Sequence, residues 1–242
     1  MTSHVLVLQT GSTLRELAAR RGDFAEWFMR CGGLPRHEVE VVRVDQGEML
    51  PSAQRFAAVL VTGSASMVTE RADWSERCAA WLAAAVRNNT VPVLGVCYGH
   101  QLLAHGLGGG VDWNPRGRQI GTRVLTTTPG AADDPLFARI EGRFRAQTTH
   151  QQSVVTLPAG AQVLAMSPLD PHQALRFGAR AWGLQFHPEF SAGIMAGYIG
   201  GRRERLAAEG IDPLALLREC GPAPQARRLL RRFVELARTA RL

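Results

Sequence analysis

Two short segments contain the residue types that nucleophilic catalysis requires. The first is residues 95–99 (GVCYG), in which Cys97 lies between two glycines directly after an apolar run. A strand that turns sharply into a helix at a nucleophile uses this spacing, because glycines let strand and helix approach closely. The start of that helix would favour the nucleophilic thiolate. We therefore predict that Cys97 is a nucleophile, with a buried structural cysteine as the alternative.

The second segment is residues 186–189 (FHPE). Side chains alternate along an extended chain, so His187 and Glu189 are expected to point to the same side. Pro188 fixes its own φ between them, which suits the end or edge of a strand. An imidazole oriented by a carboxylate can act as a general base, whereas such a pair alone is most often a surface ion pair. Together with Cys97, the pair forms a candidate catalytic triad.

The chain around these segments alternates strand-like and helix-like stretches, which is typical of an α/β fold with a mainly parallel sheet. The first half predicts apolar strands and an amphipathic helix. These strands cover 4–9, 39–45, 57–62 and 91–96, and the helix covers 74–87. The sequence therefore predicts an open, flavodoxin-like sheet flanked by helices.

Beyond the glycines at 108–110 the pattern changes to short strands joined by tight turns. We expect these strands at 119–128, 144–148, 153–157, 162–166, 173–177 and 181–186. Helices are expected to return at 192–209, 213–220 and 223–238. The second half thus predicts a small antiparallel extension followed by a helical region.

The composition is that of a globular protein, with 45% hydrophobic and 20% charged residues in 242. We expect one domain over 1–242, with a catalytic core at 1–190 and a C-terminal helical extension at 191–242. No apolar run reaches the length of a membrane span, and no signal peptide is recognised before the first strand. A cytoplasmic location without membrane contact is therefore expected.

All 28 basic residues are arginines, which excludes mechanisms that need a lysine. The four cysteines are widely spaced and form no Cys/His cluster, so neither a metal nor a cofactor is expected. The net charge of +7 is concentrated after residue 200. A helix there would pack Leu229, Leu230 and Phe233 on the domain and leave the arginines in solvent. Nucleic-acid binding is disfavoured because no stacking aromatics accompany the arginines.

Together, GVCYGHQ at 95–101 and FHPE at 186–189 resemble the class I glutamine amidotransferase family. The likeness is greatest to stand-alone members similar to the glutaminase domain of GMP synthetase, and it covers roughly residues 5–190. The resemblance implies that Cys97 is the nucleophile, His187 the base and Glu189 its partner. Residues 61–64 (VTGS) resemble the family's oxyanion loop, although a plain turn after a strand would look similar.

The oxyanion loop implies that the backbone N–H groups of Gly63 and Ser64 act together with that of Tyr98. Gln101 corresponds to a family glutamine that contacts the γ-glutamyl group.

Residues 149–154 (THQQSV) resemble a substrate-binding segment, which implies that His150, Gln151 and Gln152 lie at the pocket. A structural role for His150 is the alternative. Gln152 stands where relatives often have an acid, so recognition of a substrate amino group is weakened.

The resemblance implies a cysteine hydrolase that cleaves the γ-amide of glutamine or of a γ-glutamyl compound through a thioester on Cys97. One alternative is a glutaminase subunit that donates ammonia to a separate synthase, since the chain contains no pyrophosphate loop or Walker A motif. Another is a catalytically silent regulatory homologue, against which the intact triad argues. The expected partners are the small-molecule substrate and, in the first alternative, the synthase. The sequence leaves the oligomeric state open.

Overall fold

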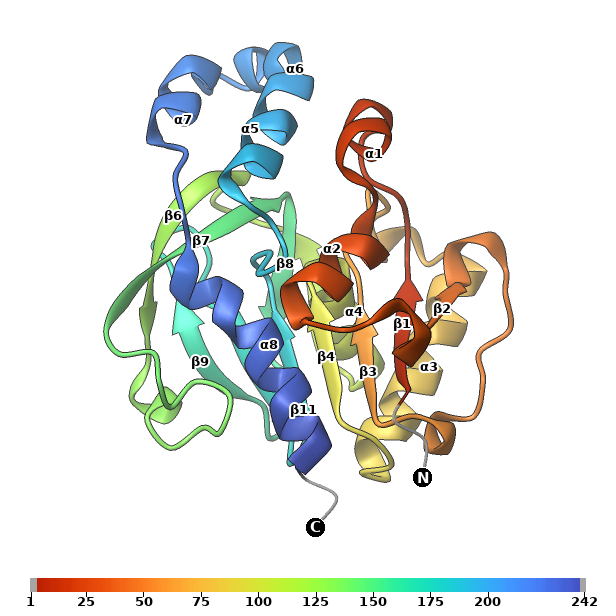
Figure 1. Cartoon of the computed structure of the whole chain (residues 1–242). Helices are drawn as coiled ribbons and strands as arrows, with labels where there is room; N and C mark the ends of the chain where they lie inside the picture. Colours follow the sequence, from red (N-terminus) through yellow and green to blue (C-terminus); the bar gives the residue numbers. More distant parts are fainter. Residues whose placement is uncertain (1–3, 240–242) are drawn as a thin grey trace.

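The structure of the chain is a computed structural model that describes residues 4–239. Within this range the strands of the central sheet are β1 (Val5–Gln9), β2 (Val39–Arg43), β3 (Ala58–Val61), β4 (Val93–Val96), β6 (Gln119–Thr127), β7 (Arg143–His150), β9 (Gln162–Met166), β10 (Ala174–Gly178) and β11 (Ala181–Leu184). Their order is β2-β1-β3-β4-β11-β10-β9-β6-β7 (Figure 1). The strands from β2 to β11 in that order are parallel, and the remaining neighbours pair antiparallel.

Both faces of the parallel strands are covered by helices, as their apolar sequences predict. The helices α2 (Phe24–Gly32) and α8 (Pro224–Thr239) cover one face, and α3 (Asp73–Arg87) and α4 (Tyr98–Gly106) cover the other (Figure 1). Side chains alternate along β1, so Val5 packs with the α2–α8 core whereas Leu6 packs with the α3–α4 core. The prediction of a mainly parallel sheet flanked by helices is confirmed.

The small antiparallel extension is also confirmed. Besides the antiparallel end of the main sheet, β5 (Gly110–Trp113) and β8 (Gln152–Thr156) form a separate two-stranded sheet. The strand β5 was not expected from the sequence, because its residues GVDW are partly exposed and show no buried alternation. Short 3₁₀ turns occupy Arg36–Glu38, Val44–Gln46, Ala53–Arg55, Val68–Glu70 and Pro129–Ala131.

The strand β11 pairs in parallel with β4, although it is formed much later in the chain. Leu184 is aligned with Val96, the last residue of each strand. The segments that follow these two strands therefore leave the sheet side by side. This arrangement brings the region after Leu184, which contains the FHPE motif, next to the turn that contains Cys97.

The remaining helices are α1 (Arg15–Arg21), α5 (Ala192–Gly201), α6 (Arg203–Ala208) and α7 (Pro213–Glu219), and they lie beyond the C-terminal ends of the parallel strands (top of Figure 1). The single helix expected over 192–209 is wrong, because the chain breaks between α5 and α6 at Arg202, with φ of −116° and ψ of 11°. Two glycines precede the break, and glycine is a poor helix former.

The apolar face of α8 is buried as predicted. Leu229 is 1% exposed, and Leu230 and Phe233 are fully buried. Among residues 4–239 there is no helix with the length and apolar character needed to cross a membrane.

Candidate active site

Cys97 lies at a strained turn between β4 and α4. Its φ is 52° and its ψ is −100°, a left-handed conformation that costs a residue other than glycine about 1–3 kcal/mol. A Cβ on Gly95 would lie 2.3 Å from the carbonyl oxygen of Gly99, and a Cβ on Gly99 would lie 2.7 Å from that of Val61. The two glycines of the GVCYG motif are therefore required for the close approach of strand and helix.

The Cys97 side chain is enclosed, and the residue is only 6% exposed. Its Sγ lies 4.0 Å from the carbonyl oxygen of Thr149, a residue of β7. The helix α4 begins at Tyr98, directly after the cysteine. The N-terminal amides of α4 thus face the region of the sulfur, where they favour negative charge.

His187 and Glu189 form a buried pair after β11. Nδ1 of His187 lies 2.7 Å from Oε1 of Glu189, and the two residues are 3% and 2% exposed. The backbone N–H of His187 donates to the carbonyl oxygen of Gln147 at 2.8 Å. The imidazole also stacks on Phe190, with ring centroids 4.1 Å apart. These contacts fix the ring, and the carboxylate holds Nδ1, so Nε2 is the nitrogen left to exchange a proton.

The structure brings His187 and Cys97 together at Gly63. A Cβ on Gly63 would lie 3.0 Å from Cε1 of His187 and 3.6 Å from Cβ of Cys97. Burial by itself lowers the pKa of His187, but attraction to Glu189 and to Cys97 outweighs burial and raises the pKa to about 10. The imidazole is therefore positively charged at neutral pH.

The predicted oxyanion loop follows β3 and is firmly held. The hydroxyl of Thr10 donates to the carbonyl oxygens of Thr62 and Gly63, each at 3.0 Å. Within residues 4–239, no hydrogen bond engages the backbone N–H of Ser64 or of Tyr98. The Tyr98 hydroxyl lies 2.6 Å from that of Ser75, away from the cysteine. The loop and the start of α4 therefore each leave a backbone donor free at the cavity that Cys97 lines.

A cavity of about 130 Å³ opens at Cys97. Its lining includes the sequence-predicted residues Ser64, Tyr98, Gln101, His150, Gln151 and Gln152. Gly63, His187 and Glu189 do not line the cavity; Gly63 lies beside both Cys97 and His187, and Glu189 contacts His187.

Several polar side chains of the lining are already engaged in hydrogen bonds. The Gln101 amide donates to the Gln152 carbonyl oxygen at 2.7 Å and to Oε1 of Gln185 at 2.9 Å. The Gln152 amide donates to the Thr69 hydroxyl at 2.5 Å. These bonds connect the helix α4 with β8 and fix the wall of the cavity.

His150 contacts the buried carboxylate of Asp170. Its Nε2 lies 3.1 Å from Oδ2 of Asp170, and both side chains are almost fully buried. Burial would raise the pKa of Asp170, but His150 outweighs this effect and lowers the pKa. His150 therefore lines the cavity and also contacts Asp170, and its role in substrate binding stays a prediction.

Sequence reasoning missed three arginines at the same cavity, namely Arg118, Arg202 and Arg205. Arg118 precedes β6, whereas the other two belong to the region around α6. They come from distant parts of the chain, so no local motif connects them. For Arg202 and Arg205 the sequence signal is the excess of arginines after residue 200, which by itself predicts a solvated surface, and Arg118 lies outside that region.

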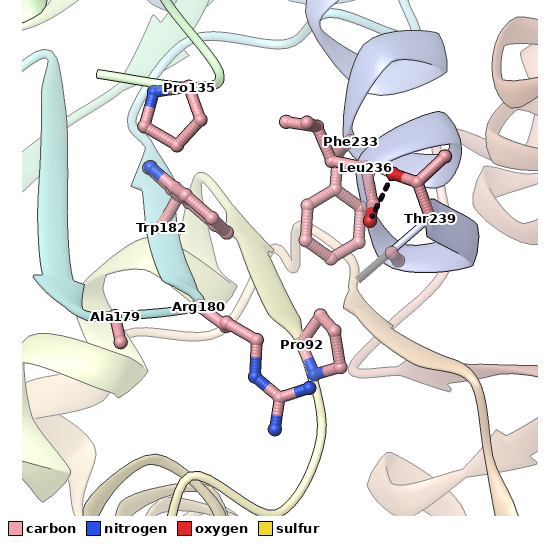
Figure 2. Close-up of a pocket in the computed structure, with 9 residues that line it drawn as sticks. Pro92, Pro135, Ala179, Arg180, Trp182, Phe233, Leu236 and Thr239 are labelled. Atoms are coloured by element: carbon pink, nitrogen blue, oxygen red, sulfur yellow. Dashed lines mark hydrogen bonds between the residues drawn. The ribbon is translucent and has the colours of Figure 1, made fainter. Parts of the chain in front are cut away.

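A second cavity of about 300 Å³ lies at the opposite end of β4 (Figure 2). It is mainly apolar, with Trp182 and the Phe233 ring in its wall. Its one charged side chain, Arg180, donates to Oδ1 of Asn89 at 2.9 Å. This cavity contains neither a nucleophile nor a proton-transfer group, so the site at Cys97 is the better candidate.

Two solved structures with the same fold are named as glutamine amidotransferases. One from Thermotoga maritima is 25% identical and superposes with a TM-score of 0.75, covering 97% of this chain and 98% of that one. A glutamine amido transferase from Methylobacillus flagellatus superposes with a TM-score of 0.70 at 20% identity, covering 98% of this chain and 94% of that one. The second likeness shows the fold alone.

Sequence comparison gives the same result. A glutamine-hydrolyzing GMP synthase of Aeropyrum pernix is 35% identical over 186 residues, which are 76% of this chain and 32% of that protein. The corresponding enzyme of Thermosipho africanus is 34% identical over 186 residues, which again are 76% of this chain and 32% of that protein. The chain thus spans about a third of the length of these curated relatives. The family model "Glutamine amidotransferase class-I" matches residues 22–199, and the chain therefore belongs to the class I glutamine amidotransferase family.

Proposed function

We propose that this chain hydrolyses the γ-amide of glutamine or of a γ-glutamyl compound through a thioester on Cys97. The observation that carries the proposal is the strained turn at Cys97 beside the buried pair of His187 and Glu189. A charged imidazole beside a cysteine stabilises the thiolate, which is the reactive form.

In the first half-reaction, the Cys97 thiolate forms a C–S bond to the γ-carbonyl carbon, and the carbonyl π electrons move to its oxygen. Backbone N–H groups of Ser64 and Tyr98, with that of Gly63, would stabilise this oxyanion, and one such donor is typically worth about 3 kcal/mol. The C–N bond then breaks as His187 gives its proton to the leaving amine. Ammonia or an amine departs, and a γ-glutamyl thioester remains.

In the second half-reaction, the now neutral His187 takes a proton from water, whose oxygen attacks the thioester carbon. The C–S bond breaks, and glutamate and the Cys97 thiolate are released with the imidazolium restored. Glu189 stabilises the imidazolium of the free enzyme and keeps Nε2 as the proton-transfer nitrogen. The net reaction consumes one water for each amide bond cleaved.

We further propose that residues 1–190 and the extension at 191–242 act as one unit. Arg202 and Arg205 belong to the extension but line the cavity at Cys97. The extension therefore completes the wall of the site in addition to packing on the sheet.

The alternative function is an ammonia donor for a separate synthase. It is favoured by the relatives, which are GMP synthases about three times as long as the matched region. In that case the released ammonia would pass to a synthetase part outside these 242 residues. A silent regulatory homologue is disfavoured, because the pair of His187 and Glu189 is buried and aligned at Cys97.

A glutamate-release assay on the isolated chain tests the proposal. Glutamine and a panel of γ-glutamyl amides and dipeptides are compared, with Cys97→Ala as the inactive control. Release that requires an added synthetase part of a GMP synthase would favour the ammonia donor. Absence of release both with and without that partner would overturn the hydrolase.

A further inference from the structure

The cavity at Cys97 is lined by cations and by no carboxylate of residues 4–239. Arg118, Arg202 and Arg205 all contribute to its wall. Gln151 and Gln152, which line the cavity beside them, are neutral amides. A ligand in this cavity therefore experiences a positive field, which favours an anionic group.

Two of the three arginines share one carboxylate. Arg118 donates to both oxygens of Glu209, at 2.6 and 2.8 Å, and Arg205 donates to Oε1 at 3.2 Å. The hydrogen bond from Arg118 is the main reason that the pKa of Glu209 falls to about 2. Arg205 also donates to Oε1 of Gln151 at 3.1 Å. Arg118 and Arg205 are thus held together by Glu209 at one wall of the cavity.

Arg202 is different, because no carboxylate of residues 4–239 lies within ion-pair distance of it. Its guanidinium donates to the Thr149 hydroxyl at 2.6 Å and lies over the Tyr198 ring, 4.8 Å from the centroid. Burial lowers the pKa of Arg202, Tyr198 opposes this effect, and Arg118 lowers the pKa further. A largely buried cation without an anionic partner is unfavourable unless a ligand supplies the anion.

Arg202 and the proposed nucleophile Cys97 both contact Thr149. Thr149 accepts its hydrogen bond through the side chain, and the carbonyl oxygen of the same residue lies 4.0 Å from Sγ of Cys97. The break between α5 and α6 places this arginine at the cavity. A substrate whose amide carbon is at Cys97 would therefore have its nearby groups within the field of Arg202.

We propose that Arg202 binds a carboxylate of the γ-glutamyl substrate. The inference rests on the proposed function and names the substrate group that Arg202 would recognise, a carboxylate. Two carboxylates have the required chemistry, namely the α-carboxylate of the glutamyl part and the terminal carboxylate of a γ-glutamyl amino acid. Arginine suits either one, because its planar guanidinium forms paired hydrogen bonds to carboxylates.

The test compares Arg202→Gln with Arg202→Lys and with the control Arg203→Gln. Arg203 is the next residue along the chain, at the start of α6; it is exposed and does not line the cavity. The substrates are γ-glutamylglycine, which has both carboxylates, and γ-glutamyl methylamide, which has only the α-carboxylate. Loss of a charge-assisted hydrogen bond predicts that Arg202→Gln raises KM about 10–100-fold and changes kcat little. Arg202→Lys should recover part of the loss, and Arg203→Gln should match the wild type.

The pattern of loss identifies the carboxylate. An equal rise in KM for both substrates assigns the α-carboxylate, and a larger rise for γ-glutamylglycine assigns the terminal one. Unchanged KM values for both substrates would overturn the proposal. A folding defect is separated by thermal unfolding, since removal of an unpaired buried cation should leave Tm unchanged or higher.

A binding measurement separates this inference from the hydrolase itself. Calorimetry with L-glutamate on Cys97→Ala requires no turnover. Binding that is lost in the double variant Cys97→Ala, Arg202→Gln would support Arg202 even if the wild-type chain proved inactive on every substrate. Binding that is equal in both variants, or absent from Cys97→Ala, would overturn an α-carboxylate site whether or not the wild type turns over.

Discussion

The backbone N–H of Cys97 donates a hydrogen bond of 2.7 Å to the carbonyl oxygen of Leu184. This bond continues the parallel pairing of β4 and β11 by one residue, to the point where both chains leave the sheet. It holds the strained turn at Cys97 against the start of the segment that contains His187. The geometry of the site therefore depends on the pairing of these two strands.

Cys97 should be the one cysteine required for activity and the one labelled first. An electrophilic glutamine analogue should modify Cys97, because burial raises the pKa of Cys31 to about 11 and of Cys78 to about 12. Cys97→Ala should lower kcat by about 10⁴-fold or more, as loss of a nucleophile does. Mass spectrometry locates the label, and Cys220→Ser is the control with retained activity. Turnover of Cys97→Ala at the wild-type level would contradict the nucleophile assignment.

Loss of His187 should be more damaging than loss of Glu189. The imidazole transfers the proton in both half-reactions, whereas the carboxylate orients the ring and stabilises its charge. We expect His187→Ala to be almost inactive and Glu189→Gln to retain measurable glutamate release. Steady-state kcat values of the two variants test this order, with the exposed Glu204→Gln as control. The reverse order would require another group to act as the base.

The stability that Glu189 gives should depend on pH. The pKa of His187 is raised from 6.5 to about 10, so the folded state binds this proton more tightly than the unfolded state. The contribution is therefore complete below about pH 6.5 and is lost as the pH rises through about 10. Urea unfolding at pH 6, 8 and 10 should show that Glu189→Gln is less stable than the wild type at pH 6. The difference should shrink toward pH 10, and a difference that grows with pH would contradict the charged pair.

A side chain at Gly95 should disrupt the turn. The Cβ of Gly95→Ala would lie 2.3 Å from the carbonyl oxygen of Gly99, a backbone atom that cannot rotate away. We expect a loss of about 1–3 kcal/mol in the free energy of unfolding, as for overpacked interiors. Gly200→Ala on α5 is the matched control, because its Cβ would have no atom within 4 Å, and alanine is the better helix former. Denaturant unfolding measures both variants, and equal stabilities would contradict the close approach.

The sequence by itself determined the local chemistry of this protein. The GVCYG motif specifies the turn, because only glycine tolerates the contacts at Gly95 and Gly99. The spacing of His187 and Glu189 predicted that their side chains meet, and they do, at 2.7 Å. The structure brings them together in a turn, with the Phe190 N–H donating to the His187 carbonyl oxygen at 3.4 Å, rather than along the extended segment that the sequence suggested. The apolar strands and the buried face of α8 could likewise be read from hydrophobic patterns, since burial and period are properties of short segments.

Only the tertiary structure decided which of these segments meet. Strand order places β11 beside β4, and no local pattern specifies a pairing between strands so distant in the chain. The same reason explains why the arginines at the cavity were missed. Arg118 and Arg202 reach one site from distant parts of the chain, and Arg202 lies at the break between two helices, where it contacts Thr149 and Tyr198. The sequence gives the number and positions of such arginines, but tertiary packing determines whether their side chains face solvent or a cavity.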